Sequence, residues 1–289
     1  MEKSDVKALF KKNWRVALEV AFFDQEKLTH TEILDPNSDQ VNSKYEAFCT
    51  KLKIKNRPWV IVIDDKYASL NSVGSYNPLN NSISLDRSIY EGVAPIDNYI
   101  LAHELGHGKD AMTRREFLQN SIVLGKGMIT GVILGKLTDV STKKLGVTDP
   151  YFRDGLGIYA GFSGGLDAVK NALKQQKRGR EFKADEYAVF LLGYRDSIQA
   201  IYSCLPEESK QEISILKAEI SNDLLTECVA KGIQPSDEEL DFLCLVHALR
   251  KMPQREVSLS DIMKDGAYPT YLERIQRFAE QMQAEENER

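Results

Sequence analysis

The chain has 289 residues, of which 42% are hydrophobic, 28% charged and 9% aromatic. This is the composition of an ordinary globular protein, and it excludes collagen-like, low-complexity and wholly disordered chains. The 38 basic and 43 acidic residues give a net charge of −5. No polycationic surface follows from that balance, so we expect no nucleic-acid partner.

The N-terminal part of the chain predicts helices followed by a strand. Apolar residues recur at helical spacing over 5–27, which predicts one amphipathic helix, and 44–55 predicts a second, shorter helix. Residues 58–64 are apolar and rich in β-branched side chains, as in a buried strand. We therefore expect 1–57 to form an N-terminal helical segment that precedes a catalytic domain over 58–280.

The region after the first strand predicts a turn and then a second strand. Residues 72–81 are rich in Ser, Asn and Gly, which favours a turn or loop. Residues 82–86 alternate polar and apolar, as a half-exposed strand does. We expect this second strand to form the edge of a small sheet.

The rest of the chain predicts mainly helices. Asp97 follows a Gly-Val-Ala-Pro break and is a candidate N-cap for a helix that continues through Leu105. We expect a helical C-terminal part over 206–280 and a frayed, charged tail over 281–289. Loops are expected near 136–152, 174–180, 232–236 and 253–270. The fold class is therefore α+β, with a small sheet packed on a mainly helical body.

Two apolar segments carry glycine at every fourth position, at 121–135 and 155–165. Small residues at this spacing let two helices approach closely, so we expect a helical hairpin over 121–173. A fifteen-residue helix is about 22 Å long, shorter than the roughly 30 Å hydrocarbon core of a bilayer. We therefore expect a soluble or surface-seated hairpin, with peripheral membrane contact through the two segments and a membrane span as the alternative.

The residues that point to chemistry are His103-Glu104-Leu105-Gly106-His107, an H-E-x-x-H pattern. On a helix, positions i and i+4 share one face, so both imidazoles can reach one metal ion. Glu104 points to the side, where a general base can take a proton from a metal-activated water. Two His ligands, no redox requirement and an open position for water suit Zn²⁺. The alternative is a surface helix with an incidental pair of histidines.

A catalytic zinc site needs a third protein ligand. The two remaining histidines, His30 and His247, lie in no recognisable motif. Glu181 and Asp185 are four residues apart and share a helix face, and small alanines at this spacing would let their helix lie close to the first. Glu181 is then the candidate third ligand, and Asp185 a hydrogen-bond partner for a ligand histidine. An exposed, charged helix face is the alternative.

H-E-L-G-H followed at a distance by E-x-x-A-D-x-x-A resembles the HtpX-type zinc metallopeptidases, gluzincins that include the CAAX prenyl endopeptidases and the Oma-type mitochondrial proteases. The resemblance implies a zincin-type fold with the sheet packed on the H-E-x-x-H helix and one Zn²⁺ per chain. It also implies His103, His107 and Glu181 as ligands, with Glu104 as base and Asp185 as supporting residue.

A downstream H-P-x-x-x-x-R-I pattern of that family is matched in part by Tyr268-Pro269 and Arg274-Ile275. The resemblance implies that Arg274 supports the ligands together with Asp185. Tyr268 replaces the family histidine, and a phenol can donate a hydrogen bond to a developing oxyanion. A packed aromatic in a loop is the alternative for Tyr268.

The sequence therefore predicts a zinc-dependent endopeptidase that acts on a protein or peptide. Two alternatives remain: an inactive zinc-binding pseudo-protease that acts as an interaction module, and a zinc hydrolase of a non-peptide bond. Four widely spaced cysteines and no secretory signal predict a cytoplasmic protein, with or without membrane association.

Overall fold

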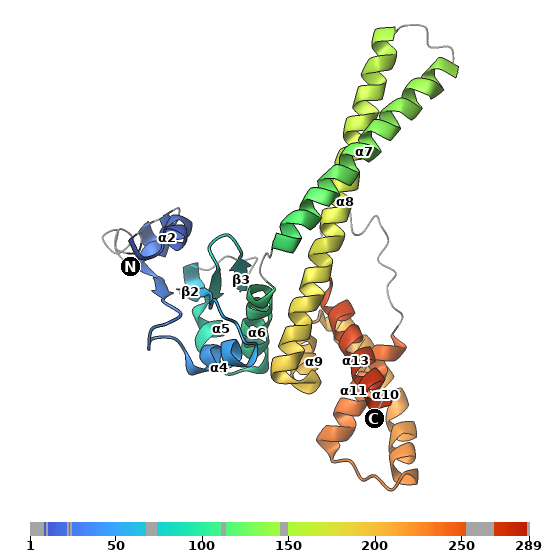
Figure 1. The fold of residues 1–289 in the computed structure, drawn as a ribbon. Coiled ribbons are helices and arrows are strands. Elements are labelled where there is room, and N and C mark those ends of the chain that lie inside the picture. Colours follow the sequence, from blue (N-terminus) through green and yellow to red (C-terminus); the bar gives the residue numbers. More distant parts are fainter. Residues whose placement is uncertain are drawn as a thin grey trace. The chain divides into compact units, whose positions relative to one another are not determined.

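The computed structural model describes residues 9–287 apart from 10, 22, 24, 68–73, 111–113, 145–149 and 253–268 (Figure 1). The chain divides into two units. The first comprises Met1–Ala111, Phe182–Glu256 and Pro269–Arg289, and the second comprises Met112–Glu181 and Val257–Tyr268.

The first unit contains a four-stranded sheet, in the order β1-β2-β4-β3. The strands are β1 (Thr31–Leu34), β2 (Trp59–Ile63), β3 (Gly74–Asn77) and β4 (Ser82–Asp86). β2 and β4 run parallel, whereas β1 and β3 are antiparallel to their neighbours. The predicted strands at 58–64 and 82–86 are confirmed as β2 and β4.

The sheet differs from the sequence prediction at its edges. β3 lies inside 72–81, where we expected a turn or loop, because Gly74–Asn77 pair with β4 while the tight turn is confined to the residues after them. β4 is therefore an internal strand, and β3 takes the edge position that we predicted for 82–86. β1 lies in the N-terminal segment that we expected to be helical, and it pairs with β2.

The central strand β2 is buried on both faces. Val60 and Val62 belong to the main hydrophobic core, whereas Ile61 and Ile63 belong to a second, smaller core. Successive side chains of a strand point to opposite faces, so a strand covered on both sides must be apolar throughout. This explains the unbroken apolar run that predicted the strand.

The smaller core is closed by the N-terminal helices. α2 (Trp14–Ala21) and α3 (Gln25–Thr29) are separate, so the single helix predicted over 5–27 is wrong within the described residues. The chain bends between them, with the N–H of Phe23 donating to the carbonyl of Val20. The bend lets Leu28 of α3 pack in the same core as Val20 of α2.

The main core of the first unit is formed by the other face of the sheet and by helices. They are α4 (Ser43–Lys51), α5 (Arg87–Glu91), α6 (Pro95–Lys109), the end of α8 (Pro150–Leu192), α9 (Tyr194–Ser203), α10 (Glu207–Ala230), α11 (Asp237–Lys251) and α13 (Tyr271–Asn287). The loop at 232–236 is confirmed, whereas α13 continues through 281–287, where we expected fraying. The α+β class, mainly helical with a small mixed sheet, is confirmed.

The second unit is built from α7 (Arg114–Lys144) and the long first part of α8. The two helices approach most closely at glycines: a Cβ atom at Gly131 would lie 2.6 Å from the carbonyl oxygen of Gly161, and one at Gly135 would lie 2.9 Å from that of Gly157. The pairing of 131 with 161 and of 135 with 157 makes the hairpin antiparallel, as Figure 1 shows. The glycine spacing thus identified the contact between the helices.

Two predicted loops are wrong in this unit. α7 continues to Lys144, so most of the loop expected from 136 is helical, and 174–180 lies inside α8. Positions 145–149 and 253–268, where other loop residues were expected, lie outside the described residues. In the part of the chain that the structure describes, no helix combines the length and the apolar character needed to cross a membrane.

Candidate metal centre

Helix α6 carries the H-E-x-x-H residues and begins earlier than predicted. Its first residue is Pro95, whose fixed φ and missing N–H suit the first position of a helix. Asp97 is therefore in the first turn rather than at the N-cap. Its Oδ2 atom accepts a hydrogen bond from the N–H of Ala94 at 3.0 Å, so the carboxylate still stabilises the helix start.

The edge strand β3 lies against the base candidate on α6. A Cβ atom at Gly74 would lie 2.9 Å from Cγ2 of Ile100 and 3.3 Å from Cγ of Glu104. Glu104 is 8% exposed. The absence of a side chain at Gly74 thus lets the strand run beside the side chain of Glu104.

Helix α8 reaches α6 through a second close contact. A Cβ atom at Gly106 would lie 2.9 Å from the carbonyl oxygen and 3.0 Å from Cα of Ala184. Ala184 and Ala188, which we expected to permit close packing, are 2% and 0% exposed. Gly106 supplies the complementary gap on α6, so a small residue on each helix brings the two backbones together.

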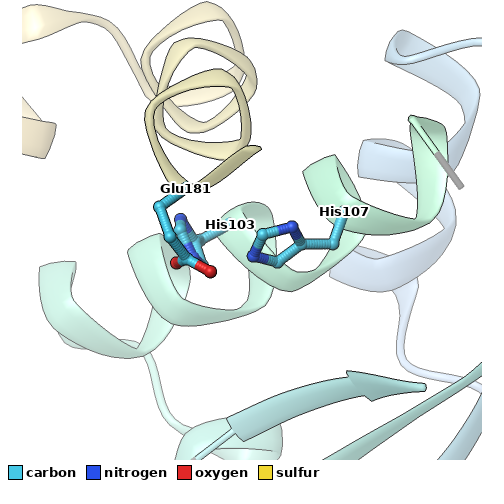
Figure 2. Close-up of side chains that lie close together, drawn as sticks. All are labelled: His103, His107 and Glu181. Carbon is cyan, nitrogen blue, oxygen red and sulfur yellow. The ribbon is translucent and has the colours of Figure 1, made fainter. Parts of the chain in front are cut away.

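His103, His107 and Glu181 form the only group of three or more potential metal ligands among the described residues, with one ligand atom of each within 4.8 Å of the others. The two imidazole rings are 4.7 Å apart between centroids and nearly perpendicular, at 85°. Figure 2 shows the Glu181 carboxylate, from the last third of α8, beside His103 and facing the same space as His107. Glu181 is the residue directly before the part of α8 that belongs to the first unit.

This donor set fits a zinc ion. Two imidazole nitrogens and one carboxylate oxygen are the ligands of a catalytic zinc site, which keeps one position open. His103 and Glu181 are 7% and 8% exposed, and His107 is half-buried. The chemistry and the partial burial therefore match a metal centre that remains accessible from one side.

Asp185 lies behind His103 and is fully buried. Its Oδ1 atom is 2.8 Å from Nδ1 of His103, and the Nε atom of Arg274 donates to its Oδ2 at 2.8 Å. The Nη2 atom of Arg274 also donates to Oδ1, so the guanidinium forms a bidentate hydrogen-bonded ion pair with the carboxylate. An ionised acceptor at Nδ1 leaves Nε2 of His103 without hydrogen and able to bind a metal.

The charges around Asp185 decide its protonation. Burial raises the pKa of this carboxyl, but hydrogen bonds from His103 and Arg274 and electrostatic attraction to them outweigh burial and lower the pKa to about 2. Asp185 is thus ionised at neutral pH. Burial, together with the charge of Asp185, raises the pKa of the neighbouring Tyr99 phenol well above its ordinary value.

The structure brings together five of the predicted site residues: the three candidate ligands, Asp185 and Arg274. Glu104 lies on the same helix beside β3, and Tyr268 lies outside the described residues. His30 is paired instead with Asp64, with 3.0 Å between Nδ1 and Oδ2. We did not predict Tyr99, whose hydroxyl donates to Asp185 at 2.6 Å. Its position one turn before His103 on the same helix face was the available signal.

A comparison with models of protein families identifies the family of the chain. The sequence model described as "Peptidase family M48" matches residues 36–239, more than half of the chain. The chain belongs to peptidase family M48. The M48 peptidase is therefore a metallopeptidase, a hydrolase whose family uses a metal, usually zinc, and acts on proteins or peptides. No curated protein matches the chain.

Proposed function

We propose that this M48 peptidase is a zinc-dependent endopeptidase of the branch that contains the HtpX-type and CAAX prenyl enzymes. The observation that carries the proposal is the approach of His103, His107 and Glu181 to within 4.8 Å, with the Glu104 carboxylate on the next position of the same helix. The resemblance of the H-E-L-G-H and E-x-x-A-D motifs to that branch supports the assignment.

The three clustered residues would bind the ion, and Glu104 would transfer the proton from the attacking water to the leaving group. Zinc, when bound, supplies Lewis acidity that activates water and polarises the scissile carbonyl. Glu104 takes the proton of the attacking water and passes it to the nitrogen of the leaving amine. Asp185 accepts a hydrogen bond from the Nδ1–H group of His103 and thereby keeps the ring oriented.

We propose that an extended substrate adds to the outer edge of β3. Among the residues that the structure describes, this strand is at the end of the sheet order. Its Gly74 lies beside Glu104, and its Tyr76 lies 3.4 Å from the position of a Cβ atom at Gly108, beyond His107. A peptide paired with this edge would run along the face of α6 that carries the clustered side chains.

Peptide cleavage by the zinc-loaded protein is the test. We expect cleavage of casein and of internally quenched peptides, which stops when a chelator removes the metal. Glu104→Gln should bind zinc as the wild type does and cleave about 100- to 10,000-fold more slowly. Glu91→Gln, an acidic residue on α5, is the control that should keep full activity.

The outcomes separate the competing functions. Zinc binding without cleavage of any peptide would favour the interaction module, and turnover only of esters or other non-peptide substrates would favour a different hydrolase. Full peptidase activity in Glu104→Gln would contradict the role of Glu104 as base.

We also propose that the M48 peptidase is a cytoplasmic protein whose hairpin contacts a membrane surface. The hairpin exposes large apolar side chains: Ile129, Val132, Ile133, Leu137 and Val140 on α7, and Ile158 and Tyr159 on α8. All four cysteines are free thiols, which suits a reducing compartment.

Sedimentation with vesicles tests the membrane contact. We expect the wild type to sediment with vesicles that contain phosphatidylserine, and the double variant Ile133→Asp, Leu137→Asp to stay in the supernatant. Both replaced side chains are more than half exposed, so the fold should survive the change. A wild type that remains wholly in the supernatant would contradict the proposal.

A further inference from the structure

The hydroxyl of Tyr99 is a buried polar group that the proposed mechanism does not use. Tyr99 lies on α6 one turn before His103 and is 3% exposed. Its hydroxyl donates to Oδ1 of Asp185 at 2.6 Å, and its ring lies 6.1 Å from the His103 ring at an angle of 25°. The metal ligand and this hydroxyl therefore come from one rigid helix and approach the same carboxylate oxygen.

A competing donor sits beside the same atoms. The Nη2 atom of Arg274 lies 3.0 Å from Nδ1 of His103 and 3.2 Å from the hydroxyl oxygen of Tyr99. With Oδ1 of Asp185 in place, Nδ1 carries the hydrogen and donates a hydrogen bond to the carboxylate. If Oδ1 moves away, Nη2 can donate to Nδ1 instead, and the hydrogen of the neutral ring then resides on Nε2. An imidazole with a hydrogen on Nε2 cannot bind a metal through that atom.

We propose that Tyr99 is a positioning residue that selects the metal-binding tautomer of His103. The hydroxyl ties Oδ1 of Asp185 to α6, whereas Arg274 ties both oxygens to α13. Without the Tyr99 hydroxyl, Oδ1 would be held only by Nδ1 of His103 and by Arg274, which compete for the same place. The hydrogen bond from Tyr99 keeps Oδ1 on Nδ1 and so keeps Arg274 from taking that place. This inference rests on the proposed metal centre and concerns how the centre is prepared before the ion arrives.

Tyr99→Phe tests the role of the hydroxyl while keeping the ring. We expect the dissociation constant for zinc, measured by competition with a chelator, to rise about tenfold. In the full-length, zinc-free protein, the nitrogen-15 NMR spectrum of the histidines should show His103 of the wild type with its hydrogen on Nδ1. The variant should show a mixture of both tautomers.

Tyr45→Phe is the matched control. Tyr45 is also fully buried, and its hydroxyl donates to the carbonyl of Pro58 at 2.5 Å, within the main core. Loss of this hydroxyl should lower stability without changing the zinc dissociation constant or the His103 spectrum. Comparison of Tyr99→Phe with Tyr45→Phe thus separates the general effect of losing a buried hydrogen bond on stability from the specific effect on zinc binding and the His103 tautomer.

The results distinguish this inference from the proposed function. A wild type that binds no zinc defeats the metal centre itself. A wild type that binds zinc, with an unchanged constant and tautomer in Tyr99→Phe, overturns the role of Tyr99 and leaves the proposed function standing. A His103 hydrogen on Nε2 in the zinc-free wild type would also contradict the proposal, whether or not the variant folds.

Discussion

The two parts of α8 are stabilised in different ways. In the second unit, the helix packs on α7 through glycine backbones, with large apolar side chains such as Ile158 left exposed. In the first unit, one face of its last turns is buried and carries Asp185 in a network of charged hydrogen bonds. Glu181 lies at the change from one to the other. One continuous helix thus contributes its first part to the hairpin and its last part to the candidate metal centre.

This difference teaches that close backbone approach alone does not identify a functional site. Gly131 with Gly161 and Gly106 with Ala184 are both tight contacts, with 2.6 Å and 2.9 Å between a Cβ position on the first residue and the carbonyl oxygen of the second. Only the contact of Gly106 with Ala184 lies next to candidate site residues. Gly106 is followed by the ligand candidate His107, and Ala184 is followed by the buried carboxylate of Asp185. Variants at the two ends of α8 should therefore have separable effects.

The largest effect is expected for Glu181→Ala. Removal of one of three protein ligands should raise the dissociation constant for zinc about 1,000-fold and abolish peptide cleavage. Glu186→Ala is the control on the same helix, since its carboxylate pairs with Arg277 at 2.5 Å near the surface. Equal zinc affinity in the two variants, measured by chelator competition, would remove Glu181 from the site.

Asp185→Asn should have the next largest effect. The change leaves the guanidinium of Arg274, whose side chain is 11% exposed, without its anion, so the free energy of unfolding should fall by about 3–5 kcal/mol. The zinc dissociation constant should rise about 10- to 100-fold, because His103 loses the acceptor at Nδ1. Denaturant titration and chelator competition measure the two effects. Normal values of both would show that the network supports neither the fold nor the metal.

Gly106→Ala should disturb the site through the backbone. The added Cβ atom meets the backbone of Ala184, so α6 and α8 must move apart at a cost of about 1–3 kcal/mol in unfolding free energy. Gly179→Ala is the matched control on α8, since nothing lies within 4 Å of its Cβ position. Alanine there should raise stability by about 0.5–1 kcal/mol and leave zinc affinity unchanged. A neutral Gly106→Ala would argue against the close contact.

The smallest effect on the metal is expected for Gly131→Ala. Its Cβ atom would meet the carbonyl oxygen of Gly161, so the hairpin should lose hydrogen-exchange protection around Ile133. We expect zinc affinity within about twofold of the wild-type value, because the ligands lie outside the contact between α7 and α8. Strong loss of zinc binding in this variant would break the distinction between the two parts of α8.

Much of the site could be predicted because helix geometry fixes it locally. The spacing of His103 and His107 places both rings on one face whatever surrounds them, and Glu181 with Asp185 follows the same rule on a second helix. That these two helices meet is a long-range fact. The small residues Ala184 and Ala188 made it plausible, and the structure supplies the contact of Ala184 with Gly106.

The parts that the sequence did not predict depend on tertiary partners. Tyr99 lies in an apolar run and has the character of a core aromatic, and only Asp185 and Arg274 give its hydroxyl a role. β3 has the composition of a turn, and pairing with β4 makes it a strand. The basic stretch 174–180 lacks an apolar periodicity, yet it is helical because α8 continues through it on both sides.

X-ray absorption by the zinc-loaded protein tests the central claim most directly. We predict one zinc per chain, with two imidazole nitrogens and carboxylate or water oxygens at about 2.0–2.2 Å, and loss of the ion in His103→Ala. Zinc surrounded by sulfur at about 2.3 Å, or no zinc bound after reconstitution, would contradict a metal centre formed by His103, His107 and Glu181.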